Sequence, residues 1–458
     1  MSNTLQSGMA LPVRSFDSGI PTKGHGHGTY GPGQQKLPAV DGLSNLLRPR
    51  SFEEIKRSLA NRGVHNGELA SSPDLAAKLE ALSRLEDAFL PSEEMVTYTA
   101  EILSRIRKLF ESRNFNDEEY RAFFYRAREV LNGREVRPLP QNMVSLRGAC
   151  FTLCGPSLMG RTAFLQRLRL MLGSPFHIFG MGPEPLRMWC VPVLPLTVPP
   201  CGSKKQLILQ IREWLLAEVG GAKAPGNALA DLTGPRAEAA AISLCILLNV
   251  ALITVDGCDF RSIGNGGFEI YNFLLRLQQY TGIPVVISGT YAFMHLAGKA
   301  GSSSSNLFSG PSLHFDPFNL PQQDEAGIPK GMSATAHRWL WSLGPVPEGQ
   351  KPPQDLAVWM HCLTHGRWGW MVLAYHALHV ALCKKPNLLA PGALTQEKVE
   401  RLVKLELRNH QGAREFIEAF EKSRMVNEAS QFFDYMDHLP YQAFSIKKHK
   451  DWLKEIRR

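Results

Sequence analysis

The stretch ACFTLCGPSLMGRT, residues 149–162, decides how the rest of the chain is interpreted. It begins with a short apolar run, continues into a loop with a glycine at each end, and leads into a segment with helical periodicity. The spacing is that of the phosphate-binding loop G-x-x-x-x-G-K-[ST], in which backbone N–H groups surround a phosphate and the next helix adds its positive end. A chance glycine-rich turn is the alternative, and the strand–loop–helix context favours the phosphate loop. The predicted loop residues are Gly155, Pro156, Ser157, Leu158, Met159, Gly160, Arg161 and Thr162.

Two side chains qualify as magnesium ligands. The hydroxyl of Thr162 would bind Mg²⁺ beside a nucleotide phosphate, as the last residue of the motif does. Asp256 ends the apolar run ALITVD, residues 251–256, and would hold the same ion through water. A helix or turn cap is the alternative for Asp256. Arg161 stands where the motif has Lys, and its planar fork could pair with a phosphate while positioning it differently.

Between residues 145 and 330, short apolar runs alternate with helix-like segments. The runs that we interpret as strands are 149–154, 189–198, 251–256 and 284–289, and the helix-like segments are 162–172, 204–219, 236–248 and 269–280. Continuous apolar strands separated by helices indicate a mostly parallel sheet covered on both faces. We therefore predict an α/β fold with a nucleotide-binding core at 145–330.

Helical patterns and compositional shifts divide the remaining chain. Residues 1–72 are rich in Gly, Ser and Pro and are expected to be mostly disordered, although Ser51-x-x-Glu54 predicts a capping box that opens a short helix. Periodic apolar residues predict a helical region at 73–144 and a helical lid at 331–425. Residues 426–458 form a tail with six basic residues near its end, which would bind DNA or a partner, or dock on the lid as an amphipathic helix.

Composition limits the class of protein. The 458 residues carry 51 Lys and Arg against 42 Asp and Glu, so the formal charge of +9 permits a polyanionic partner without requiring one. With 44% hydrophobic residues the chain is neither wholly disordered, nor collagen-like, nor a coiled-coil rod. Eight Cys without a C-x-x-C pair predict buried free thiols in a reducing cytoplasm, and no apolar run is long enough to predict a membrane span.

Taken together, these motifs resemble those of an AAA+ ATPase of the TnsC/TniB type. The resemblance runs from about Glu86 to Phe420 and rests on the order and spacing of EDAFLP, GPSLMGRT, VALITVDGCDF and LTHGRWGWMVLAYHAL. Such proteins regulate DNA transposition and link target selection to a transposase. The resemblance implies an AAA+ P-loop core, ATP with Mg²⁺ as ligands, and a homo-oligomeric ring or filament on duplex DNA. It further implies transposase and target-selection proteins as partners.

The departures from this family pattern concern hydrolysis. Arg161 replaces the Lys of the loop, Gly257 replaces the Glu that follows the strand acid, and the paired Arg of the family are missing at Asn306-Leu307. Each such group contributes orders of magnitude to the rate, so their combined loss implies hydrolysis that is slow or absent. Asp259, two residues beyond Gly257, could serve as a substitute base.

The resemblance also gives roles to residues outside the loop. Thr290 ends the strand 283–290, where a polar sensor of the γ-phosphate would lie, and a plain strand-to-loop turn fits equally well. Arg367 begins the lid helix and is either a sensor in cis or a solvent-exposed helix-cap residue. The candidates for contact with DNA phosphates are Lys204, Lys205 and, with less support, Arg261, each of which could equally be a solvated surface charge.

We therefore expect an AAA+ transposition regulator that oligomerises on duplex DNA and binds ATP with little or no turnover. Two other functions stay open. The chain could be a non-catalytic scaffold with a vestigial nucleotide site, or an active ATPase that uses Arg161 and Asp259 in a rewired site.

Overall fold

The structure is a computed structural model, and all descriptions concern the unit Ala39–Arg458. The residues that it describes are 41–64, 69, 74–113, 117–130, 149–179, 187–199, 202–218, 235–260, 262, 267–297, 308, 310–323 and 329–455. Most of the extension at 1–72 that was predicted to be mostly disordered lies outside these ranges, as do Asn306, Leu307 and Arg261.

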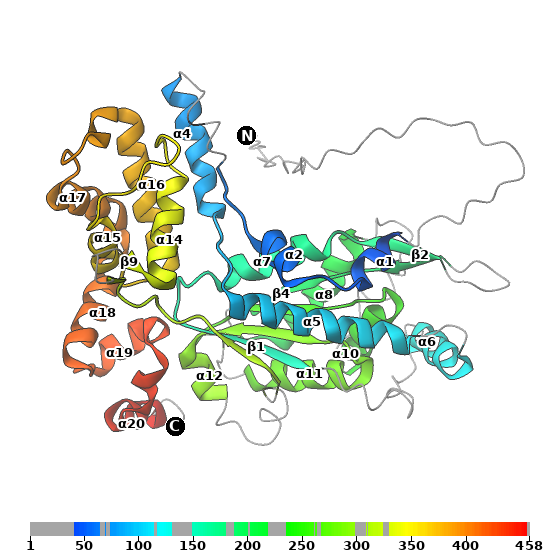
Figure 1. The fold of residues 1–458 in the computed structure, drawn as a ribbon. Coiled ribbons are helices and arrows are strands. Elements are labelled where there is room, and N and C mark those ends of the chain that lie inside the picture. Colours follow the sequence, from blue (N-terminus) through cyan, green and yellow to red (C-terminus); the bar gives the residue numbers. More distant parts are fainter. Residues whose placement is uncertain are drawn as a thin grey trace, which may run out of the picture. The chain divides into compact units, whose positions relative to one another are not determined.

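A parallel sheet of five strands forms the centre of the described core (Figure 1). Its spatial order is β4 (Leu194–Thr197), β5 (Ile253–Cys258), β6 (Val285–Gly289), β1 (Cys150–Cys154) and β7 (Ser312–His314). The strand β6 therefore lies between the strand that precedes the phosphate loop and the strand that carries Asp256. Because all five strands run in the same direction, their carboxyl ends meet at one edge of the sheet.

Successive side chains of the central strands enter two different cores, as the pleat of a strand requires. Phe151, Leu153 and Val286 pack with α5 (Glu93–Ser112) and α7 (Arg161–Leu172) on one face. Val285 and Ile287 pack on the other face. The helices there are α6 (Glu118–Val130), α8 (Lys204–Glu218), α10 (Pro235–Leu247) and α11 (Gly267–Thr281). A parallel sheet covered on both faces confirms the predicted α/β class.

The predicted strand at 189–198 is wrong in its extent. Residues Arg187–Cys190 form β3, which pairs antiparallel with β2 (Phe176–Phe179) in a separate two-stranded sheet. The chain then turns and begins β4 at Leu194. Pro192 lies in the turn, and because proline has no N–H to donate to a ladder it divides the apolar run in two.

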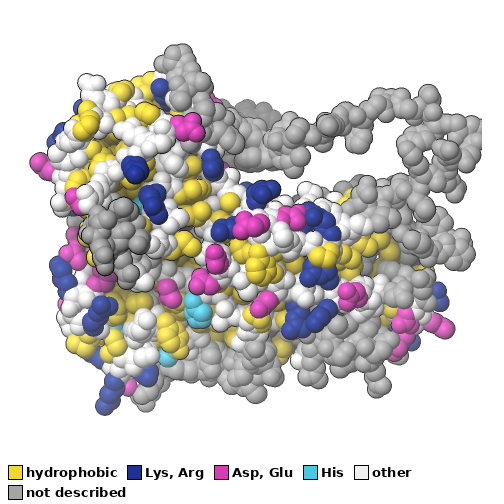
Figure 2. Space-filling model, in the orientation of Figure 1, with side chains coloured by type: hydrophobic (Ala, Val, Ile, Leu, Met, Phe, Trp, Pro, Cys, Tyr) yellow, Lys and Arg dark blue, Asp and Glu magenta, His cyan; other side chains and the backbone are white. Residues whose placement is uncertain are grey.

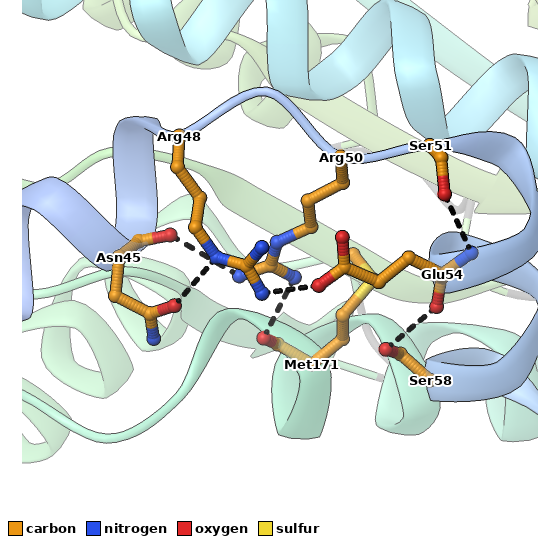
Figure 3. A network of polar contacts seen from close by, with 7 residues as sticks. All are labelled: Asn45, Arg48, Arg50, Ser51, Glu54, Ser58 and Met171. Carbon is orange, nitrogen blue, oxygen red and sulfur yellow. Dashed lines mark hydrogen bonds and ion pairs between the residues drawn. The ribbon is translucent and has the colours of Figure 1, made fainter.

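Two short helices precede the core, and they are tied to the helix that follows the phosphate loop (Figure 3). The helices are α1 (Asp41–Leu47) and α2 (Phe52–Leu59). Ser51 caps α2 by accepting a hydrogen bond from the backbone N–H of Glu54, as predicted, but the Glu54 carboxylate pairs with Arg48 instead of completing the box. Arg50 donates to the carbonyl of Met171 at 3.1 Å, so its guanidinium caps the last turn of α7.

The chain from Gly331 onward is helical as predicted, and its apolar residues share one core. The helices of the lid are α14 (Gly331–Ser342), α15 (Leu356–Thr364), α16 (Trp368–Lys384), α17 (Gln396–Glu406) and α18 (Gln411–Ser423). Leu82 of α4 (Leu75–Ser83) and Tyr291 of α12 (Tyr291–Ala297) join their core. The remaining elements are η1 (Arg84–Asp87), β8 (Gln322–Gln323), β9 (Pro329–Lys330), η4 (Pro386–Leu389) and η5 (Leu407–His410).

The predicted basic tail is folded over most of its length. It forms α19 (Ala429–Tyr435), η6 (Met436–His438), η7 (Tyr441–Ser445) and α20 (Lys447–Glu455). Phe432, Phe444 and Leu453 are fully buried in the lid core. The tail therefore docks on the lid, which was one of the two alternatives for it.

Two predictions from composition can be compared with the described residues. The seven cysteines that the structure describes are all free, and five of them are buried. Among the helices of the described ranges, none combines the length and the apolar character that crossing a membrane requires.

Two buried histidines make the lid sensitive to acid. Burial lowers the pKa of His337 to about 3 and that of His379 to about 4, below the ordinary value of 6.5. Because both are neutral when folded, their contribution to stability is complete above pH 6.5 and is lost as the pH falls toward 4. We expect the free energy of unfolding to fall there by up to about 1.4 kcal/mol per pH unit for each histidine. Urea titrations at pH 7.5, 6 and 5 measure this slope. His379→Gln should reduce this slope, and an unchanged slope in that variant would contradict the assignment.

Candidate nucleotide site

The loop between β1 and α7 needs glycine at both ends for different reasons. A Cβ at Gly155 would lie 2.5 Å from the carbonyl oxygen of Phe315, so only glycine fits beside the end of β7. Gly160 has a φ of +85°, in the left-handed region, and its Cβ would lie 3.2 Å from the ring of Trp368. The two glycines of the predicted motif therefore hold a compact loop at the start of α7.

The structure brings together the two side chains predicted to hold magnesium. Thr162 is the second residue of α7, and Asp256 lies near the carboxyl end of β5. The Thr162 hydroxyl donates to the Asp256 carboxylate at 2.6 Å, although 94 residues separate them. A hydroxyl and a carboxylate are oxygen ligands of the kind that Mg²⁺ prefers. The described residues contain no group of three or more His, Cys, Asp and Glu that could hold a metal.

Arg161 faces the same edge of the sheet as Asp256. Burial lowers the pKa of its guanidinium, and attraction by Asp256 and Asp437 opposes this effect. An arginine keeps its charge at neutral pH even in such surroundings. Arg161 therefore places a fixed positive charge beside the phosphate loop.

The segment after Asp256 has an irregular backbone. Gly257 has a φ of +78°, and a Cβ there would lie 3.3 Å from Cγ2 of Thr197. The register of β5 against β6 also shifts between Val255 and Cys258. Asp259, the proposed substitute base, accepts from the backbone N–H of Ser262 at 2.7 Å and closes a local turn. Its contacts therefore give no support to the rewired site.

The two predicted sensors, Arg367 and Thr290, both lie at the site. The alternative that Arg367 is a solvent-exposed helix-cap residue is wrong. Arg367 is only 1% exposed, so it is not a solvent-exposed cap residue. It donates to the carbonyl oxygens of Ser157 at 3.1 Å and of His438 at 2.5 Å, and its guanidinium lies 5.4 Å from the ring centre of Trp370. Thr290, at the end of β6, donates its hydroxyl to the carboxylate of Asp437.

Asp437 is the residue at this site that the sequence analysis missed. Its carbonyl oxygen accepts from the backbone N–H of Ser157 at 2.8 Å, and its carboxylate accepts from the backbone N–H of Phe260 at 3.2 Å. Burial raises the pKa of Asp437, and the hydrogen bond from Thr290 opposes this. Phe432 and Met436, four residues apart and just before Asp437, indicate a helix with one apolar face. The prediction for this segment rested instead on the basic residues at the end of the chain.

The predicted DNA contacts are only partly accessible. Lys204 pairs with Glu238 at 2.8 Å and with Glu269 at 3.4 Å, and Glu238 also pairs with Arg276. The hydrogen bond to Glu238 raises the pKa of Lys204. Lys205, on the same helix, is exposed. On the face drawn in Figure 2, basic side chains are interspersed with acidic and hydrophobic ones.

No family model and no curated protein matches this chain. Among solved structures, it is similar to the ORC2 protein of Aeropyrum pernix, determined as ADPNP-ADP complexes. The two sequences are 13% identical, the match covers 74% of this chain and 85% of the other, and the TM-score is 0.36.

Proposed function

We propose that this protein is an AAA+ regulator of DNA transposition that binds ATP with Mg²⁺ and turns it over slowly or not at all. It would oligomerise on duplex DNA and link target selection to a transposase. The hydrogen bond between Thr162 and Asp256 beside the phosphate loop carries the nucleotide part of this proposal. The order and spacing of the motifs carry the transposition part.

The residues at the edge of the sheet have distinct roles in this proposal. The backbone N–H groups of residues 157–160 surround the phosphates, and Arg161 adds a fixed positive charge. Thr162 and Asp256 would hold a magnesium ion, which would supply positive charge to the phosphates. Arg367 precedes the lid helix α16 and contacts the phosphate loop at Ser157. A change in the loop on nucleotide binding would therefore move the lid helices.

The contact with DNA depends on charge from several subunits. Lys205 is exposed at the start of α8, and the basic residues of α20 lie near the end of the chain. Each chain of an oligomer needs to neutralise only a few phosphates, which is compatible with a formal charge of +9. Lys204 would contribute only after leaving Glu238.

Removal of the Thr162 hydroxyl tests the nucleotide site. We expect Thr162→Ala to weaken the binding of ATPγS with Mg²⁺ about tenfold or more, because the ion loses one ligand and Asp256 loses its partner. Isothermal titration of the purified full chain measures the affinity. Thr97→Ala, an exposed threonine on α5, is the matched control and should bind like the wild type. Equal affinities for the two variants would contradict the proposed site.

Electron microscopy of the same preparations tests the assembly. We expect rings or filaments on duplex DNA with ATPγS and Mg²⁺, and fewer of them with Thr162→Ala. Equal assembly with and without nucleotide would favour the scaffold with a vestigial site.

A further inference from the structure

The C-terminal segment of the chain reaches the nucleotide site through one residue. Asp437 lies in η6, between α19 and η7, and it contacts three separate parts of the core. Its carbonyl oxygen accepts from Ser157 N–H at 2.8 Å, and its carboxylate accepts from Thr290 Oγ1 and from Phe260 N–H. These partners come from the phosphate loop, the end of β6 and the segment after β5.

The donors that Asp437 occupies are donors that a phosphate would need. Ser157 N–H belongs to the loop whose backbone would surround the nucleotide phosphates, and Thr290 is the predicted sensor of the γ-phosphate. A backbone N–H and a hydroxyl each carry a single hydrogen. Neither group can donate fully to Asp437 and to a phosphate oxygen at the same time.

The charge of Asp437 also resembles that of a phosphate in this site. Arg161 lies close enough to interact electrostatically with Asp437, and the arginine is the fixed positive charge beside the loop. A carboxylate and a phosphate are both acceptor-only anions of the kind that an arginine and backbone N–H groups bind. Asp437 therefore supplies an internal anion where the proposed ligand would bring an external one.

A second contact holds the neighbouring residue against the loop. Arg367 donates to Ser157 through one nitrogen and to His438 through another, and both acceptors are carbonyl oxygens. The ring of His438 stacks on Trp370 with an angle of 15° between the planes. One buried arginine of the lid thus joins the phosphate loop to the segment that carries Asp437.

We infer that Asp437 is a built-in competitor of the nucleotide, so that binding of ATP requires η6 to leave the phosphate loop. This inference rests on the proposed function and concerns the regulation of the same site. Only molecules in which the site is open bind nucleotide. The apparent affinity is therefore the affinity of the open site multiplied by the fraction of molecules that are open. Binding of nucleotide, in turn, releases the segment of residues 429–445.

Nucleotide affinity of Asp437 variants of the full chain tests the competition. With ATPγS and Mg²⁺ as the probe, we expect Asp437→Ala to bind about tenfold more tightly than the wild type, because the variant frees Thr290 and removes a negative charge, although its backbone carbonyl can still accept from Ser157 N–H. Asp437→Asn should fall between the two, because it keeps the shape and loses the charge. Asp434→Ala removes an exposed carboxylate from the preceding helix and should bind like the wild type.

Hydrogen exchange of the wild-type chain gives a second measurement that does not depend on the folding of a variant. We expect peptides covering residues 429–445 to exchange faster when ATPγS and Mg²⁺ are added, because the segment leaves the loop. Unchanged or slower exchange in these peptides on binding would overturn the inference.

The outcomes separate the two proposals. If the wild type binds nucleotide, Thr162→Ala weakens that binding and Asp437→Ala behaves like Asp434→Ala, the competition is wrong and the nucleotide site stands. If neither the wild type nor Asp437→Ala binds ATPγS at millimolar concentration, the proposed nucleotide site fails, and the competition fails with it because it rests on that site.

Discussion

Replacing Trp370 with alanine is expected to lower the free energy of unfolding by about 3–5 kcal/mol, the usual cost of truncating a large buried aromatic side chain. Trp370 is completely buried in the lid core. Its indole lies beneath the Arg367 guanidinium and stacks on His438, with a ring-centre distance of 6.3 Å to the histidine. Truncation leaves a cavity and removes the aromatic surface on which the charged group of Arg367 rests.

Chemical denaturation of the full chain, followed by circular dichroism, measures this loss. Trp370→Phe should keep more than half of the stability that alanine removes, because a smaller ring still fills most of the space. Trp359→Ala, a tryptophan of α15 that is only partly buried, is the matched control and should cost less. A loss for Trp370→Ala no larger than that of Trp359→Ala would show that the contact between lid and loop has little energetic weight.

Introducing the missing glutamate by Gly257→Glu is expected not to produce an active ATPase. A positioned group of this kind contributes roughly 100-fold or more to the rate, and the wild type is expected to lack that contribution. Gly257 adopts a φ of +78°, which costs a residue with a side chain about 1–2 kcal/mol. The new Cβ would also press on Thr197 at 3.3 Å, so the carboxylate would not be held where an attacking water needs it.

Single-turnover release of phosphate from ATP measures this rate for the wild type and the variant. Gly349→Glu is the matched control for strain, because Gly349 has a φ of +79° with nothing within 4 Å of its Cβ position. We expect both variants to lose stability and neither to gain turnover. A rise of about 100-fold for Gly257→Glu alone would show that the site lacks only the glutamate.

The sequence predicts the parts of this fold that are coded locally. The strand at Cys150–Cys154, the glycines of the loop and the start of α7 all follow from residues that are adjacent in the chain. The pair of Thr162 and Asp256 spans 94 residues but could still be predicted, because each member ends a recognisable motif. The strand β7 escaped prediction because three residues are too few for a periodic signal.

The rest of the site depends on tertiary packing that no local pattern encodes. The sequence around Arg367 is compatible both with an exposed helix cap and with a buried side chain. Arg367 is buried because it packs against Trp370 and the segment around His438. Asp437 lies in a region whose charge predicted a partner outside the chain, whereas its contacts are with the chain's own loop. A hydrogen bond between residues more than 100 positions apart in the sequence, such as that between Thr290 and Asp437, can be identified only once the fold is known.

The position of Asp437 late in the chain has a consequence for biosynthesis. Thr290 and Asp437 are 147 residues apart, so at roughly 5–20 residues per second the ribosome makes the aspartate about 7–30 s after the threonine. During that interval β1, β5 and β6 and their loop already exist without the carboxylate that later contacts them. A nascent chain therefore passes through a stage in which the loop between β1 and α7 has been made and Asp437 has not, and the mature arrangement forms only after the last helices have been made.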